Sequence, residues 1–413
     1  MTQDPNESVE AFRARARDWL AATLPRRLDR VAADTVEDDS HEWERARELQ
    51  KTLYEGGFAG ICFPTEYGGL GLGEEYQKAF TEESEGYELP LLLNVPSFAI
   101  CAATLLETGS EEQKRERIGA AIRGEEIMCQ LLSEPSGGSD LAGLITRAEP
   151  DGDGWVLNGA KTWSTSAYAA DWGLCLARTD WDAPKHQGLT MFLVPLDAPG
   201  LTMNRVRMVN GSREFCEEFF DDVRLPHSSV VGEVGDGWTV ASRQLFHERS
   251  AVGGGSPYIS GRRSVRTRSY PAPDQVARAV GADDDPFVRE LLGEYLALTT
   301  VHQQTVERVS GAITAGTLPP SASSMLRLLH AEVGHLSADL GLRIAGSAVA
   351  TGDGGTPGTE GWAGIGYLMR QGGSLGGGST EIARNIISER MLGMPREHAP
   401  DRGVPFREVR RGN

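Results

Sequence analysis

The stretch QLLSEPSGGSDLAGLITRAEPDGDGWVLNGAKTWSTS, residues 130–166, decides the fold prediction. Two polar clusters, at 133–140 and 161–165, flank a segment patterned as β-structure. The glycines let backbone N–H groups approach a ligand, the hydroxyls are short donors, and Trp163 offers a flat face. This combination suits a polar heteroaromatic ring, although a Gly/Ser turn beside a β-hairpin explains the same residues equally well.

The composition excludes several classes of function. The chain has 413 residues, with 41 basic against 59 acidic side chains and a net charge of -18, so we expect neither nucleic acid nor an anionic membrane as a partner. The five cysteines are widely spaced and form no Cys/His cluster, so we predict neither disulfides nor a metal site. The acidic N-terminus resembles no secretory signal, and the longest apolar runs are too short to span a bilayer, which favours a cytoplasmic location.

The pattern of apolar residues divides the chain into three domains and a tail. Residues 1–127 have helical periodicity, and residues 128–235 contain strand-like runs separated by turns. Helical signals return over 236–396, and residues 397–413 form the tail. The predicted class is therefore α+β, with an N-terminal helical domain, a middle antiparallel β domain and a C-terminal four-helix bundle.

Individual elements follow from local signals. Ser110 and Gln113 form a capping box, and Asp285-Pro286 is a strong helix start. Asp151-Gly152-Asp153-Gly154 predicts a hairpin turn before a strand. The C-terminal helices are expected at about 239–264, 285–316, 321–345 and 381–392. The polar segment from Arg266 to Asp284 is predicted to be a loop or lid.

Five motifs occur in an order that is specific to one family. They are FPTEYGGLGL at 63–72, SEPSGGSD at 133–140, NGAKTWST at 158–165, FFDDVRLP at 219–226 and GGGSTEIARNIISERMLG at 376–393. With these motifs the chain resembles the FAD-dependent acyl-CoA dehydrogenase family from about Phe12 to Arg396. The resemblance implies FAD, held mainly between the β domain and the bundle.

The resemblance also implies roles for single residues. Ser133 matches a hydroxyl residue that contacts the flavin, Trp163 the aromatic packed on the isoalloxazine, and Thr165 the hydroxyl near the hydride-accepting nitrogen. Ser139 matches a serine near the thioester and the cofactor phosphates. The implied FAD contacts are Leu131, Ser133, Gly138, Ser139, Trp163, Ser164, Thr165, Gly377, Ser379 and Glu381. The implied substrate contacts are Ser139, Gly377 and Arg249.

The family reaction needs a carboxylate that removes the α-proton of an acyl thioester. The loop glutamate used by many members aligns with Gly377, whose backbone N–H could still polarise the thioester carbonyl. Other members carry the glutamate in a Glu-Arg pair on the first bundle helix, which makes Glu248 the predicted base. A solvated carboxylate paired with Arg249 or Arg243 is the alternative role of Glu248.

Two other side chains are weaker candidates for the base. Glu381 is expected to serve a helix N-terminus, and His247 to be a packing or hydrogen-bonding residue.

The resemblance implies an acyl-CoA substrate, an electron-transfer flavoprotein or similar acceptor, and a homodimer or homotetramer. The family's Arg-x-x-Phe-Gly motif is absent from 262–284, and Arg343 replaces a glutamine, so the inter-subunit part of the FAD site differs. Three alternatives stay open: an acyl group on a carrier protein, a subunit of a heteromeric dehydrogenase, and a flavin oxidase or monooxygenase.

Overall fold

The computed structural model describes residues 7–26, 40–252, 256–261, 270–350 and 360–409. The N-terminal part is helical, as predicted. Its helices are α1 (Val9–Thr23), α2 (Ser40–Glu55), α3 (Glu74–Glu83), α4 (Leu91–Leu93), α5 (Ala103–Thr108), α6 (Glu111–Gln113) and α7 (Gly119–Ile122). Two π-helical segments, Asn94–Ala102 and Lys114–Ile118, join α4 to α5 and α6 to α7.

Local sequence signals account for these helices. Phe12, Ala16 and Leu20 are the buried face of α1, and Ser110 forms the predicted capping box with Gln113. The continuous helix from Leu91 to Thr108 is long and apolar enough to cross a membrane, so it is longer than the apolar runs considered above. It is 61% buried inside the fold, which accounts for its composition as that of a core helix.

The middle part is a twisted eight-stranded sheet, and it confirms the predicted β domain. Its strands are β1 (Met128–Leu131), β2 (Arg147–Asp151), β3 (Gly154–Thr165), β4 (Trp172–Arg178), β5 (Leu189–Pro195), β6 (Leu201–Val206), β7 (Phe215–Pro226) and β8 (Val230–Val231). The order is β6-β7-β3-β2-β4-β5-β8, and β1 pairs with β4. Most pairs are antiparallel, but β4 runs parallel to both β1 and β2. The predicted hairpin joins β2 to β3 with Asp151 opposite Gly154.

The C-terminal part is helical, again as predicted. It contains α8 (Gly237–Val252), α9 (Pro273–Ala279), α10 (Pro286–Thr314), α11 (Ser323–Ala345), α12 (Glu360–Met369) and α13 (Thr380–Ile386). Asp285 caps α10, since its carboxylate accepts hydrogen bonds from the N–H groups of Phe287 and Val288.

Two boundary predictions in this part are wrong. The described helix α8 ends at Val252, and residues 256–261 are not helical. The segment predicted as a loop contains the short helix α9, which begins with a proline at its first turn and buries Val276 and Ala277 against α11.

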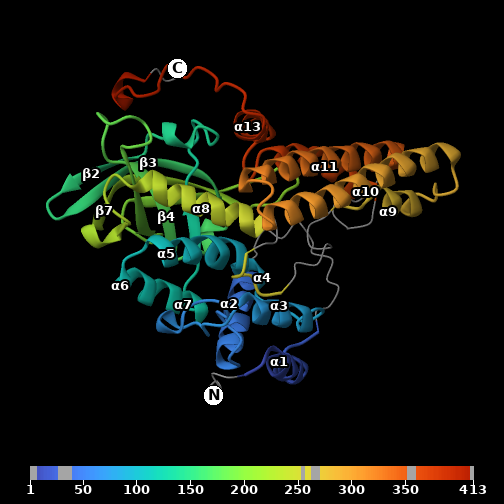
Figure 1. The fold of residues 1–413 in the computed structure, drawn as a ribbon, viewed down its shortest axis with the longest axis horizontal. Coiled ribbons are helices and arrows are strands. Elements are labelled where there is room, and N and C mark those ends of the chain that lie inside the picture. Colours follow the sequence, from blue (N-terminus) through green and yellow to red (C-terminus); the bar gives the residue numbers. More distant parts are fainter. Residues whose placement is uncertain (1–6, 27–39, 253–255, 262–269, 351–359, 410–413) are drawn as a thin grey trace.

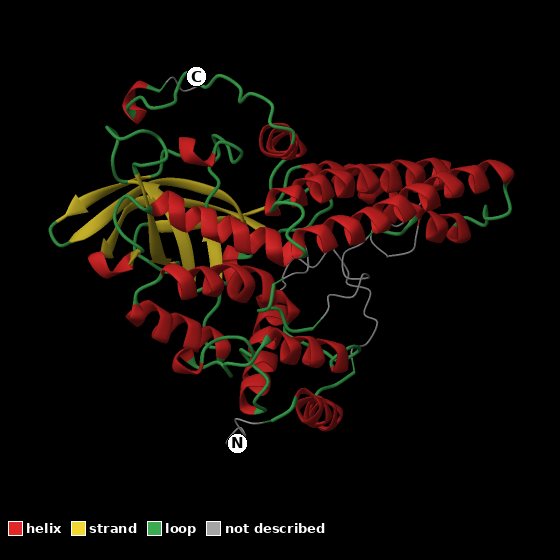
Figure 2. Ribbon diagram, viewed as in Figure 1, coloured by secondary structure: helices red, strands yellow, loops and turns green. Residues whose placement is uncertain are grey.

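The helices of the C-terminal part pack in two different places (Figure 1). Helix α11 is the centre of the C-terminal unit, and α9, α10, α12 and α13 pack against it. Helix α8 instead packs on the Asn94–Ala102 segment, α5 and β5, so it lies between the sheet and the N-terminal helices. Figure 2 shows the sheet on one side of the molecule and the long α10–α11 pair extending from the other.

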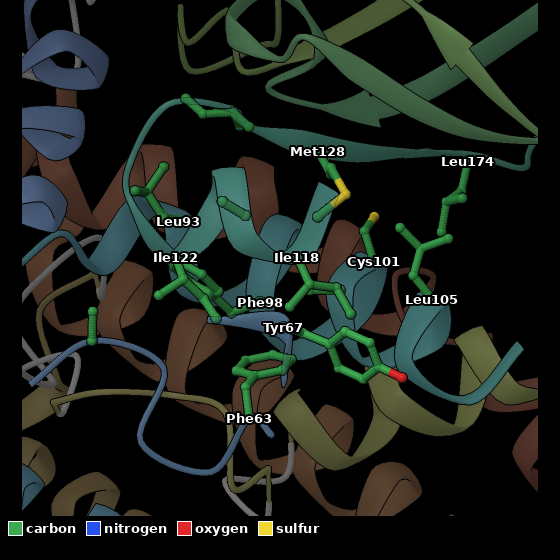
Figure 3. Close-up of a cluster of buried hydrophobic side chains, with 14 of the residues drawn as sticks. Phe63, Tyr67, Leu93, Phe98, Cys101, Leu105, Ile118, Ile122, Met128 and Leu174 are labelled. Atoms are coloured by element: carbon green, nitrogen blue, oxygen red, sulfur yellow. The ribbon is translucent and has the colours of Figure 1, made fainter. Parts of the chain in front are cut away.

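A continuous apolar core joins the N-terminal helices to the sheet. Cys101 and Leu105 project from the helix Leu91–Thr108 towards Met128 on β1 and Leu174 on β4, whereas Phe98 packs near Phe63 in the same cluster (Figure 3). Strand β1 leads into the 133–140 cluster. The packing of β1 in this core therefore fixes the position at which the cluster begins.

The C-terminal tail packs on the middle domain, which the sequence did not indicate (Figure 1). Phe406 is buried, and its ring centroid lies 3.4 Å from the guanidinium carbon of Arg178. The backbone N–H groups of Phe406 and Arg407 donate to the carbonyl oxygens of Ala183 and Trp181 at 3.0 and 2.9 Å. The tail that follows α13 is therefore anchored to the loop between β4 and β5 by these contacts.

Candidate active site

Trp163 occupies a β-bulge in β3. The register between β3 and β7 shifts between Thr162 and Ser164, so Trp163 has no partner in the ladder. Its φ is +62°, and its side chain is 54% exposed, with the ring of Phe215 edge-on at 5.7 Å. A left-handed backbone at a bulky residue costs about 1–3 kcal/mol and is typical of functional positions. The bulge thus presents a flat aromatic face at the surface.

The residues after Trp163 alternate between inside and outside. Thr165 is exposed, whereas Ser164 is buried and its hydroxyl lies 2.8 Å from Oε2 of Glu218. Trp163 and Thr165 can therefore offer an aromatic face and a hydroxyl to a ligand. Ser164, predicted to contact the cofactor, can do so only through its backbone.

A buried ion pair holds the 133–140 cluster against β3. Lys161 Nζ lies 3.0 Å from Glu134 Oε1 and 3.0 Å from the carbonyl oxygen of Leu132, and both charged side chains are almost fully buried. Glu134 also accepts hydrogen bonds from the N–H groups of Ile145 and Thr146 at 2.7 and 2.8 Å. Burial opposes ionisation, but Lys161 and these donors outweigh it and lower the pKa of Glu134.

The cluster itself is open to solvent and close to β3. The carbonyl oxygen of Ser133 accepts a hydrogen bond from Thr162 N–H at 2.9 Å, so Ser133 lies beside the strand that carries Trp163. Gly138 and Ser139 are exposed, and a Cβ on Gly138 would approach the Ser133 hydroxyl to 2.9 Å. Leu131, another predicted contact, is fully buried in β1, so only its backbone is available to a ligand.

Glu248 is half-buried on α8 and faces the sheet. Its Oε2 accepts a hydrogen bond from Nε2 of Gln130 on β1 at 3.2 Å. Among the described residues no arginine or lysine lies within 4.0 Å of its carboxylate, and Arg243 pairs with Glu107 instead. The structure therefore brings the predicted base to the strand that leads into Ser133.

His247 and Arg249, the neighbours of Glu248, face elsewhere. His247 is buried, lies 3.0 Å from Glu107 Oε1 and has a pKa lowered by burial, which confirms its predicted role in packing and hydrogen bonding. Arg249, predicted to contact the substrate, is exposed on α8.

The second group of predicted residues lies on the loop before α13. Gly377 and Gly378 have φ of +73° and +94°, and a Cβ on either would meet no atom within 4 Å. Ser379 caps α13, and Glu381 lies in the first turn of this helix, at the helix N-terminus where it was expected. A polar hollow of about 350 Å³ adjoins this loop. Its lining includes Glu332, His335, Ser374, Glu381 and Arg384.

The described structure does not bring the two groups together. Within the described ranges no hydrogen bond joins Gly377, Ser379 or Glu381 to residues 133–165. Arg343, which replaces the expected glutamine, has its guanidinium 5.7 Å from the ring of Phe287. Residues 262–269, part of the segment from which the Arg-x-x-Phe-Gly motif is absent, lie outside the described residues.

The residues around β3 fit a flavin. An exposed tryptophan held in a strained conformation, the hydroxyls of Ser133 and Thr165, and the uncovered backbone at Gly138 provide one flat face and several short polar groups. Sequence reasoning missed Gln130 and Glu218. Glu218 could have been found, because it is a carboxylate at an inward-facing position of the strand Phe215–Pro226. The sequence around Gln130 contains no comparable signal of a functional role.

Comparisons with known proteins place the whole chain in one family. Models of the acyl-CoA dehydrogenase N-terminal, middle and C-terminal domains match residues 6–125, 129–223 and 235–392. Acyl-CoA dehydrogenase IpdE1 of Mycobacterium tuberculosis is 34% identical over 397 residues, which cover 95% of this chain and 99% of that protein.

Solved structures agree with these matches. The Tcur3481-Tcur3483 steroid ACAD has a TM-score of 0.71 and 28% identity, covering 96% of this chain and 100% of that one. The ChsE4-ChsE5 complex from Mycobacterium tuberculosis has a TM-score of 0.66 and 25% identity, covering 96% and 100%. The chain belongs to the acyl-CoA dehydrogenase family of FAD-dependent oxidoreductases.

Proposed function

We propose that this protein oxidises an acyl-CoA to its α,β-unsaturated thioester, with Glu248 as the base that removes the α-proton. The observation that carries the proposal is the placement of Glu248. The carboxylate is half-buried, has no cation within ion-pairing distance among the described residues, and is hydrogen-bonded only to the Gln130 amide. An oriented carboxylate that no ion pair neutralises is suited to accept a proton.

The other residues of the site bind and orient. Bound FAD would accept the hydride from the β-carbon. The exposed face of Trp163 would cover the ring system and exclude water, and the hydroxyls of Ser133 and Thr165 would bond to its polar edge. The backbone N–H of Gly377 is proposed to polarise the thioester carbonyl, and Ser139 to lie near the phosphates.

Glu248→Gln tests the base. We expect turnover to fall by about 10²–10⁴-fold while FAD stays bound, because the amide keeps the shape of the side chain and cannot take the proton. Glu44→Gln is the matched control and should change turnover little, since Glu44 is exposed on α2, outside the residues assigned to the site. Rapid anaerobic bleaching of the flavin band in Glu248→Gln would refute the assignment.

The open loop before α13 favours a bulky acyl group. Gly377 and Gly378 leave space where a side chain would project, and a solved relative of this fold is a steroid ACAD. We therefore propose a polycyclic or otherwise ring-containing acyl-CoA as the substrate. Flavin bleaching across a panel of acyl-CoA thioesters tests this, and faster bleaching by straight-chain thioesters would contradict it.

Pairing with a different subunit is the second candidate for the assembly. Two solved relatives have paired names, Tcur3481-Tcur3483 and ChsE4-ChsE5, and the residues expected at the inter-subunit part of the FAD site are altered here. If the protein purified alone is yellow, with one FAD per chain and a homodimeric or homotetrameric mass, the heteromer is excluded.

The acceptor and location complete the proposal. We propose an electron-transfer flavoprotein or similar acceptor, and a cytoplasmic location that suits the five free cysteines. Stoichiometric peroxide production in air would instead indicate an oxidase, and activity only with a carrier-protein thioester would change the substrate class.

A further inference from the structure

A buried carboxyl group lies directly behind the Trp163 bulge. Glu218 on β7 is fully buried, and its Oε2 lies 2.8 Å from the hydroxyl of Ser164, the residue between Trp163 and Thr165. Its other oxygen, Oε1, has no hydrogen-bond partner among the described residues. A buried carboxylate with only one partner is costly if it is charged.

Within the described part of the chain, no arginine or lysine pairs with this carboxyl alone. Lys161 on β3 faces it across the ladder, but the Lys161 ammonium is already bonded to Glu134 and to the Leu132 carbonyl oxygen. Glu217 adds a second acidic group on β7. Three thiols in the described structure also feel the charge of Glu218, and burial raises their pKa and keeps them neutral: Cys129 on β1, Cys175 on β4 and Cys216 on β7. Burial accordingly raises the pKa of Glu218 to about 8.

We propose that Glu218 is a positioning residue for the flavin site: its neutral carboxyl holds Ser164, and through it the Trp163 bulge, and loss of its proton weakens FAD binding. This inference rests on the proposed function only in taking the ligand of the bulge to be FAD. It concerns the back of the cradle and does not involve Glu248.

The ladder explains how a proton could have this effect. The β3–β7 pairing is interrupted between Thr162 and Ser164, and the strained φ of Trp163 persists only while its neighbours hold it. An ionised Glu218 is stabilised most when water reaches Oε1, which has no hydrogen-bond partner among the described residues. Water would enter at the bulge, because this is the break in the ladder nearest to Glu218. Hydration there relaxes the Trp163 face and the Thr165 hydroxyl, which are the groups offered to the flavin ring.

The test compares how the affinity for FAD depends on pH in the presence and in the absence of the Glu218 carboxyl group. The holoenzyme is freed of FAD, and the dissociation constant is measured near pH 6.5 and pH 9.5 for the parent, Glu218→Gln and Glu217→Gln. We expect a rise of about tenfold or more at the higher pH in the parent, a change comparable to one pKa unit. Glu218→Gln should show less than about a twofold rise, because its amide does not ionise. Glu217→Gln should behave as the parent.

The same rise in Glu218→Gln as in the parent, or no rise in the parent, overturns the inference. If Glu218→Gln does not fold, hydrogen exchange at residues 162–166 of the parent apo-protein decides instead. Corrected for the intrinsic rate, it should accelerate above about pH 8, and a flat profile overturns the inference. Because neither assay needs an acyl-CoA, failure of the Glu248 assignment would leave this result standing, and the reverse is also true.

Discussion

The two sides of the proposed flavin site are built in different ways. The side around β3 is closed, because Lys161 and Glu134 form a buried ion pair and a bulge holds Trp163 in place. The side before α13 is open, since Gly377 and Gly378 contact nothing at their Cβ positions and Leu375 is 65% exposed. One side is complete within this chain, whereas the other leaves space that a ligand or a second subunit would fill. Substitutions should therefore cost stability on the first side and little on the second.

Breaking the ion pair should have the largest effect. Glu134→Gln leaves the Lys161 ammonium buried without a counter-ion, and we expect unfolding to become easier by about 3–5 kcal/mol. Urea denaturation of the apo-protein measures this. The control is Glu381→Gln, which removes an exposed pair with Arg384 on the open side and should change stability by less than about 1 kcal/mol. Equal losses in both variants would remove the distinction between the sides.

The pH dependence of stability should come next. Glu218 has a pKa near 8 in the folded protein against 4.5 as its ordinary value, so the folded state binds an extra proton between these values. Stability from this group is complete below about pH 4.5 and is lost as the pH rises through 8. Between about pH 6 and pH 9.5 we expect the parent to lose about 2–3 kcal/mol more than Glu218→Gln. Parallel pH profiles for the two proteins would show that Glu218 does not titrate in this range.

The elements with local signals were the best predicted from sequence. The hairpin at Asp151–Gly154 and the caps at Ser110 and Asp285 depend on neighbouring residues, and the structure has all three. The motif around Trp163 indicated an exposed aromatic residue. It did not indicate that Ser164 points inward, since a bulge changes which side chains face the core without changing the composition.

Contacts between distant segments could not be predicted. The bonds of Glu218 with Ser164, of Gln130 with Glu248, and of Phe406 with the β4–β5 loop join residues that lie far apart in the sequence. Each depends on the register of the sheet or on the path of the tail, and neither leaves a periodic signal. The short helix α9 was missed for a related reason, because only its packing against α11 makes a seven-residue helix stable.

Trp163→Gly should separate stability from binding on the closed side. Glycine tolerates the φ of +62° and the side chain is 54% exposed, so we expect the apo-protein to gain about 1 kcal/mol or more. FAD affinity should fall by about tenfold or more because the stacking face is lost, a loss of at least about 1.4 kcal/mol in binding. Denaturation and FAD titration give the two quantities. A variant that is less stable and binds FAD unchanged would mean that the tryptophan is a structural residue only.

Adding one methyl group on each side should give the smallest effects and the most direct comparison. Gly377→Ala places its Cβ in open space, so the only cost is the left-handed φ, about 1 kcal/mol, and FAD affinity should hardly change. Gly138→Ala has no such backbone penalty, but its Cβ would lie 2.9 Å from the Ser133 hydroxyl. Ser133 must then rotate away from the position proposed to contact the flavin, which should weaken FAD binding while stability stays almost the same. If Gly377→Ala proves the more damaging to FAD binding, the open side already holds the cofactor closely within one chain, and the contrast between the two sides is wrong.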